Sequence, residues 1–130
     1  MPDETKLTVY VVDDDASVRH ALELLLNSAG MEVVTFKLAA ECIEYELKEE
    51  SSCLITDIKM PGINGLELQQ KLIERKIKIP VIFLTAFDTK ETRDQVKQLG
   101  AVGYFKKPVD DQALIDAILW AMSRNASSKD

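Results

Sequence analysis

The fold of this chain is decided near its N-terminus by the segment Leu7-Thr8-Val9-Tyr10-Val11-Val12-Asp13-Asp14-Asp15. Its first six residues are β-branched or apolar, and three consecutive acidic residues then end the apolar run. A short apolar run that stops so abruptly is typical of a buried strand that reaches solvent at its carboxyl end. The segment therefore predicts a strand over residues 7–12, followed by a polar loop.

The same alternation of strand and helix continues along the chain. Apolar residues at helical spacing follow the first strand as far as Ala29, and Gly30 then stands where a C-terminal cap belongs. Further strands are predicted over residues 31–36, 53–56, 80–85 and 102–105. The remaining helices are predicted from apolar residues on their inward faces: Ala39, Ile43 and Leu47; Leu68 and Leu72; Val96 and Leu99; Leu114, Ile115, Ile118, Leu119 and Met122.

Capping patterns predict where two of these helices begin. Asn64 with Glu67, and Asp88 with Glu91, have the three-residue spacing of a capping box. Asp15 has the residue type of a turn former or helix cap. The helix after Asp88 has few large inward residues, so we expect it to be held loosely.

Five strands that alternate with five helices predict a doubly wound α/β fold. Such strands are parallel, are joined by right-handed crossovers, and carry helices on both faces of the sheet. A chain of 130 residues with 46% hydrophobic residues suffices for one core without a disulfide or a structural metal. We expect one domain over residues 1–124, with residues 125–130 as a polar tail or the start of a linker.

Composition excludes several classes of function. The net charge of −6 opposes direct binding to nucleic acid by this chain. No apolar run approaches the roughly 18 residues of a membrane-spanning helix, and the N-terminus has no signal-peptide pattern. Cys42 and Cys53 lack metal-binding spacing and are expected to be reduced and buried. These features predict a soluble cytoplasmic protein.

The residues at the carboxyl ends of the predicted strands are of types that one reaction needs. Asp13 and Asp14 follow the first strand, and Asp57, Thr85 and Lys107 follow the third, fourth and fifth. Parallel sheets of this kind place ligand sites at these ends. Three neighbouring carboxylates repel one another unless one is protonated or a cation lies between them, and Mg²⁺ is the simpler solution. We expect Asp14 and Asp57 to bind it directly and Asp13 through water.

This set of residues fits phosphoryl transfer to a carboxylate. Asp57 can act as the nucleophile, while Mg²⁺ and Lys107 offset charge and the Thr85 hydroxyl donates to a phosphoryl oxygen. Each residue also has a purely structural interpretation, because aspartates cap turns and Lys107, beside Lys106, can be a solvated charge. The inference depends on their occurrence together at four strand ends.

His20 is expected to be a surface residue, and Trp120 to lie in the core or an interface.

Specific motifs give the chain a close resemblance to the response-regulator receiver family, from about residue 7 to residue 122. They are Val11-Val12-Asp13-Asp14, Thr56-Asp57-Ile58-Lys59-Met60-Pro61-Gly62-Ile63-Asn64-Gly65, Thr85-Ala86, Tyr104 and Lys107-Pro108. Phrases such as Pro80-Val81-Ile82-Phe83-Leu84-Thr85 are most similar to receivers of the nitrogen-fixation regulator type, which are joined to helix-turn-helix transcription factors.

The resemblance implies a fold and a mechanism. The fold is flavodoxin-like, with strand order 2-1-3-4-5, and the backbone carbonyl of Lys59 completes the Mg²⁺ site. A sensor histidine kinase donates the phosphoryl group, and the domain is not an enzyme beyond its own phosphorylation and dephosphorylation. Phosphorylation draws in Thr85, frees space for Tyr104 and remodels the fourth helix, fifth strand and fifth helix, with homodimer formation as one outcome. The output is transcription in a longer protein; the alternatives are a stand-alone receiver or a receiver of a hybrid kinase.

Two residues are expected to set the lifetime of the phosphorylated form. Lys59, two residues after Asp57, and Phe87, two residues after Thr85, neither orient nor activate an attacking water.

Lys59 also argues against a haloacid-dehalogenase-type phosphatase, which needs a second aspartate at that position. A flavin-binding module would need a Ser, Thr and Gly loop in place of the acidic residues after the first strand.

Overall fold

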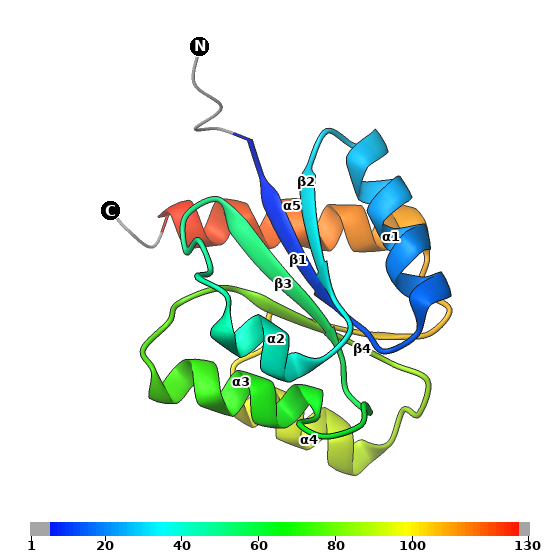
Figure 1. Cartoon of the computed structure of the whole chain (residues 1–130), viewed down its shortest axis with the longest axis vertical. Coiled ribbons are helices and arrows are strands. Elements are labelled where there is room, and N and C mark those ends of the chain that lie inside the picture. Colours follow the sequence, from blue (N-terminus) through cyan, green and yellow to red (C-terminus); the bar gives the residue numbers. More distant parts are fainter. Residues whose placement is uncertain (1–5, 128–130) are drawn as a thin grey trace.

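The structure, a computed structural model, describes residues 6–127, and only the backbone in the last turn of the final helix. Within these residues five parallel strands form one sheet in the order β2-β1-β3-β4-β5, which confirms the predicted topology. The elements are β1 (Thr8–Val12), α1 (Ala16–Ser28), β2 (Glu32–Phe36), α2 (Ala39–Glu44), β3 (Ser52–Asp57), α3 (Gly65–Glu74), β4 (Val81–Thr85), α4 (Lys90–Gln98), β5 (Gly103–Lys106) and α5 (Asp111–Ser127). Figure 1 shows helices on both sides of the sheet.

The core has two halves, one on each face of the sheet. Successive side chains of a strand point to opposite faces, so β1 sends Val9 and Val11 toward α1 and α5, and Tyr10 and Val12 toward α2 and α3. The strands β1, β3 and β4 are buried throughout. This accounts for their continuous apolar runs, because a parallel sheet covered by helices has no solvent face.

The predicted start of α3 is confirmed and that of α4 needs a correction. The Asn64 carboxamide accepts from the Glu67 N–H, and the Glu67 carboxylate accepts from the Asn64 N–H, both at 2.8 Å. In α4 the cap is Thr89, whose hydroxyl accepts from the Thr92 N–H at 3.1 Å. Asp88 does not cap the helix because its carboxylate is bound to other side chains.

Most strand boundaries differ from the sequence predictions by one residue, and two helix ends differ by more. The helix α2 ends at Glu44, so Leu47 packs against the core from a loop; there the Lys48 N–H donates to the buried Tyr10 hydroxyl at 2.8 Å. The strand β5 begins one residue later than predicted, at Gly103, which pairs with Ile82. The helix α5 continues to Ser127, three residues into the predicted tail, and residues 128–130 lie outside the described part of the chain.

The buried stripe of α5 is narrower than predicted. Leu114, Ile118 and Met122 are buried, but Leu119 is exposed by 46% and Trp120 by 52%. Because each helical residue turns by about 100°, these two side chains lie past the edges of a stripe centred on Ile118. Trp120 is therefore not a core residue.

Both cysteines are buried, as predicted, and are not joined by a disulfide. Cys42 lies on α2 and Cys53 on β3, and burial raises the pKa of each thiol to about 12. His20 is exposed on α1, which confirms its predicted place at the surface. No helix in residues 6–127 has both the length and the apolar character that crossing a lipid bilayer demands.

Candidate functional site

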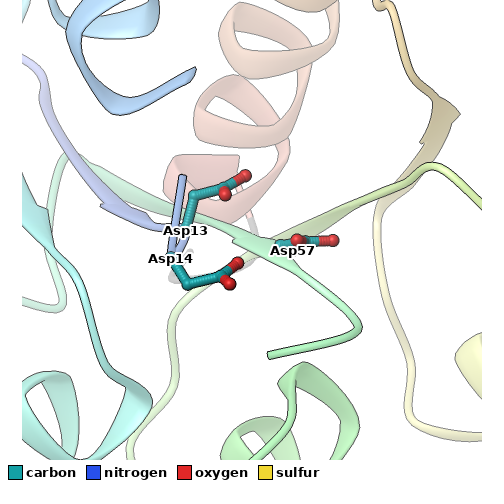
Figure 2. A group of neighbouring side chains, drawn as sticks. All are labelled: Asp13, Asp14 and Asp57. Carbon is teal, nitrogen blue, oxygen red and sulfur yellow. The ribbon is translucent and has the colours of Figure 1, made fainter. Parts of the chain in front are cut away.

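Three carboxylates meet at the carboxyl end of the sheet. Asp13 and Asp14 follow β1, and Asp57 is the last residue of β3, so the adjacent parallel strands deliver them to one edge (Figure 2). One carboxylate oxygen from each residue lies within 4.8 Å of the others. Asp13 and Asp57 are buried, whereas Asp14 is exposed. Oxygen atoms this close form a hard, negatively charged donor set of the kind that divalent cations bind.

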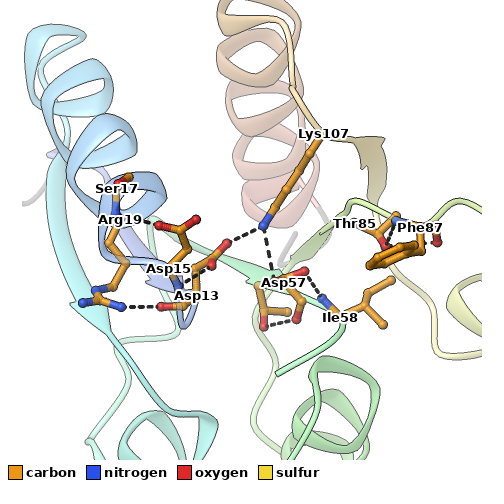
Figure 3. A network of polar contacts seen from close by, with 10 residues as sticks. Asp13, Asp15, Ser17, Arg19, Asp57, Ile58, Thr85, Phe87 and Lys107 are labelled. Carbon is orange, nitrogen blue, oxygen red and sulfur yellow. Dashed lines mark hydrogen bonds and ion pairs between the residues drawn. The ribbon is translucent and has the colours of Figure 1, made fainter. Parts of the chain in front are cut away.

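Lys107 links two of these carboxylates. Its ammonium nitrogen lies 2.8 Å from Asp13 Oδ2 and 3.3 Å from Asp57 Oδ2 (Figure 3). Burial acts to lower the pKa of Lys107, but the hydrogen bond that Lys107 donates to Asp13 and the charges of both aspartates outweigh it, and the pKa is raised. The ammonium group therefore remains charged and fixed at the edge of the site.

The environment of Asp57 disfavours its charge. Burial is the largest influence and raises the pKa of its carboxyl; Lys107 lowers it and Asp13 raises it again, so the pKa lies above the ordinary value. One oxygen, Oδ1, accepts the backbone N–H of Ile58 at 2.8 Å. The single positive charge of Lys107 thus does not fully compensate the acidic cluster, and a further cation would stabilise the ionised form.

Asp13 is held at three of its atoms. Its Oδ1 accepts the Asp15 N–H at 2.9 Å, its Oδ2 accepts from Lys107, and its backbone carbonyl accepts from Arg19 Nη1 at 2.7 Å. Asp15 in turn caps α1 by accepting the Ser17 N–H at 2.8 Å, as its residue type predicts. The acidic loop is therefore fixed by its own hydrogen bonds, which Figure 3 displays beside Lys107.

The Thr85 hydroxyl is turned to the loop after β4. It accepts the Phe87 N–H at 3.0 Å and donates to the Phe87 carbonyl at 3.1 Å. Thr85 is 1% exposed, while the Phe87 ring is 60% exposed and lies 4.5 Å from Lys59 Nζ. Lys59 and Phe87, the two residues predicted to set the lifetime of the phosphorylated form, are thus in contact with each other.

The chain matches the family model of the response regulator receiver domain over residues 9–119. It belongs to this family. The receiver is 39% identical over 123 residues to the transcriptional regulatory protein TdiR of Thauera aromatica, which covers 95% of this chain and 54% of TdiR. It is 37% identical over 120 residues to the transcriptional regulatory protein FixJ of Azorhizobium caulinodans, covering 92% and 57%.

A solved structure of the response regulator StyR superimposes with a TM-score of 0.88 at 42% identity, covering 95% of this receiver and 63% of that chain. The likeness to FixJ confirms the resemblance to nitrogen-fixation regulators that the motifs predict. The receiver spans about half the length of the curated relatives it matches.

Tyr104 of the receiver makes a contact that its sequence does not predict. Its hydroxyl donates to Asp88 Oδ1 at 2.9 Å, and Arg93 Nη1 donates to the same oxygen at 2.7 Å. Hydrogen bonds from Arg93 and then Tyr104 lower the pKa of Asp88, while burial and the Asp88 contact raise that of Tyr104. The Tyr104 ring is half-buried against the core beneath α4.

Gly65 is the second residue whose role the sequence leaves hidden. A Cβ at this position would lie 2.2 Å from the backbone oxygen of Asp57, closer than any real contact allows. The Gly65 N–H donates to the Ile58 carbonyl at 2.8 Å, so α3 starts directly against the end of β3. Only a glycine fits here. The signal that could have revealed it is a glycine directly after the Asn64 cap of α3, eight residues after Asp57.

Proposed function

We propose that the receiver accepts a phosphoryl group on Asp57 from a sensor histidine kinase in a Mg²⁺-dependent reaction. The observation that carries the proposal is the cluster of three carboxylates with the Lys107 ammonium bonded to Asp13 and Asp57. A nucleophilic carboxylate, a fixed cation and a cation-binding donor set are the parts that phosphoryl transfer to an aspartate requires.

The donor set fits Mg²⁺. All the ligands are oxygen atoms, and the raised pKa of Asp57 reflects burial first and the negative charge of Asp13 second, so a bound cation would favour the ionised form. Asp14 and Asp57 would bind the ion directly, Asp13 through water, and Lys59 through its backbone carbonyl. When bound, Mg²⁺ supplies charge stabilisation for the phosphoryl oxygens.

The protein's own residues account for the rest of the step. One carboxylate oxygen of Asp57 forms a bond to phosphorus as the P–N bond of a phosphohistidine breaks, and the electron pair of that bond stays on the imidazole nitrogen. Lys107 holds an oxygen of the transferred group. Thr85 donates its hydroxyl to another oxygen after releasing the Phe87 carbonyl.

The proposal includes an output. The new charge on Asp57 draws Thr85 toward it, Tyr104 fills the vacated space, and the surface of α4, β5 and α5 changes for a partner or a second copy. Relatives named as transcriptional regulatory proteins support an effector domain beyond this receiver, which would be joined to it through a linker that begins within residues 125–130. The proposed site of action is the cytoplasm, which the proposed kinase donor and the two free, buried cysteines support.

Intact-protein mass spectrometry tests the transfer. With Mg²⁺ and acetyl phosphate the receiver should gain one phosphoryl mass, and Asp57→Asn or chelation should abolish the gain. Asp116→Asn is the matched control, because Asp116 is an exposed aspartate of α5 hydrogen-bonded to Gln112. Undiminished labelling of Asp57→Asn would overturn the assignment.

Sedimentation of the phosphorylated form tests self-association, which an unchanged mass would contradict.

A further inference from the structure

Asp88 makes hydrogen bonds to two elements of the proposed switch surface. One carboxylate oxygen, Oδ1, accepts both the Tyr104 hydroxyl of β5, at 2.9 Å, and Arg93 Nη1 of α4, at 2.7 Å. The sequence pattern assigns Asp88 to helix capping, but Thr89 fills that position. The Asp88 carboxylate is therefore not needed to start α4, and its two bonds serve to connect the helix with β5.

The neighbouring residue holds the other switch residue. The backbone of Phe87 binds the Thr85 hydroxyl through its N–H at 3.0 Å and its carbonyl at 3.1 Å. Phe87 and Asp88 are adjacent in the chain, so a shift of the Phe87 backbone that frees Thr85 also displaces Asp88. The two switch residues are thus bound to consecutive residues of one loop.

The two ends of α4 are anchored differently. At the C-terminal end, the Leu99 carbonyl accepts from Nε2 of Gln69, a residue of α3 that is only 7% exposed, at 3.2 Å. Val96, in the same half, is the buried residue of α4. At the N-terminal end the contacts to Asp88 are exposed, and such ion pairs are weak. The end near the phosphoacceptor site is therefore the easier one to release.

We propose that Asp88 is a latch that holds Tyr104 and the start of α4 in the resting arrangement. Opening this latch lets α4 pivot about its C-terminal end at Leu99. The inference rests on the proposed function in one respect, because phosphorylation is the event that opens the latch. A contact made in only one of two states biases the equilibrium toward that state, so loss of Asp88 favours the released arrangement.

Amide hydrogen exchange followed by NMR on the unphosphorylated protein tests the latch without any phosphoryl donor. In Asp88→Ala, exchange at the amides of Phe87, Thr92 and Arg93 should accelerate about fivefold, the effect of losing roughly one net hydrogen bond. Exchange at Leu99 should not change, because the pivot is intact. Tyr104→Phe, which removes only the hydroxyl, should accelerate the same amides.

Asp94→Ala is the matched control, because Asp94 is an aspartate of α4 that pairs with Lys90 and its replacement makes the same charge change. Equal exchange in Asp88→Ala and Asp94→Ala, or acceleration that includes Leu99, would overturn the latch. The wild type is then measured with acetyl phosphate and Mg²⁺. Acceleration in Asp88→Ala together with a wild type that gains no phosphoryl mass would support the latch and overturn the proposed function, so the two failures are distinguishable.

Discussion

The ammonium nitrogen of Lys59 lies 4.5 Å from the centroid of the Phe87 ring. This cation–π contact connects the loop after β3, which follows the proposed phosphoacceptor Asp57, with the loop after β4, which follows Thr85. Both side chains are exposed, so the contact lies at the surface of the molecule and not in the core. We expect the pair to keep water from a phosphoryl group on Asp57.

The first prediction is that the phosphorylated form is long-lived because of this pair. The double variant Lys59→Asn, Phe87→Glu should lose phosphate about tenfold faster, since polar side chains can orient an attacking water. Decay of the acyl phosphate is followed by intact mass after removal of the donor. Lys90→Asn, an exposed lysine of α4, is the control. Equal or slower decay in the double variant would refute water exclusion by these residues.

The second prediction concerns the pH dependence of stability without metal. The folded-state pKa of Asp57 is raised, so the folded protein holds the Asp57 proton more tightly than the unfolded chain does. Binding of this proton stabilises the folded protein at pH values below the pKa that Asp57 has in the unfolded chain. The stabilisation is lost as pH rises through the pKa that Asp57 has in the folded protein. Asp57→Asn should therefore be more stable than wild type at neutral pH, on the order of 1 kcal/mol, and the difference should shrink in acid.

Urea unfolding of both proteins across pH in a chelator measures this difference. Adding Mg²⁺ should stabilise the wild type and leave the variant nearly unchanged, because the ion compensates the charge that the variant lacks. A variant less stable than wild type at neutral pH would show that the Asp57 charge is already satisfied by Lys107.

The third prediction is that Lys107 stabilises the metal-free protein. Lys107→Met keeps most of the side chain but removes its charge and leaves the charges of Asp13 and Asp57 unpaired, at a cost of roughly 2–3 kcal/mol. The raised pKa of Lys107 means that this stabilisation is present at neutral pH and is lost only as pH rises through that pKa. Lys106→Met, the exposed neighbour, should have little effect in the same denaturation experiment.

The fourth prediction concerns Gly65. Gly65→Ala forces a methyl group against the Asp57 carbonyl, so the start of α3 or the end of β3 must move, at a cost of about 3 kcal/mol. Phosphoryl transfer should fall with it, because Asp57 is displaced. Gly100→Ala is the comparison, because an added Cβ at Gly100 would have no atom within 4 Å other than those of its chain neighbours. The positive φ of 75° at Gly100 alone costs about 1 kcal/mol. Thermal unfolding that ranks Gly100→Ala as the more damaging change would contradict the packing argument.

The sequence predicts the sheet and the convergence of the acidic residues because both depend on local patterns and on the rule for parallel strands. Apolar runs mark the buried strands within a residue or two, and topology then carries Asp13 and Asp57 to one edge. What it misses depends on distant partners. After α2 ends, the Lys48 N–H donates to the Tyr10 hydroxyl, which lies 38 residues earlier in the sequence. The role of Asp88 appears only with its hydrogen bond from Tyr104, 16 residues later.

The two buried cysteines lie on opposite sides of the sheet, Cys42 in the half of the core beneath α2 and α3, and Cys53 in the half beneath α1 and α5. Because each thiol has a pKa of about 12, a maleimide or disulfide reagent reaches a thiolate only when that half of the core opens. Alkylation kinetics at the two sites therefore time the opening of each layer separately, without any engineered probe. A phosphorylation event that loosens α4 would accelerate labelling on the Cys42 side alone.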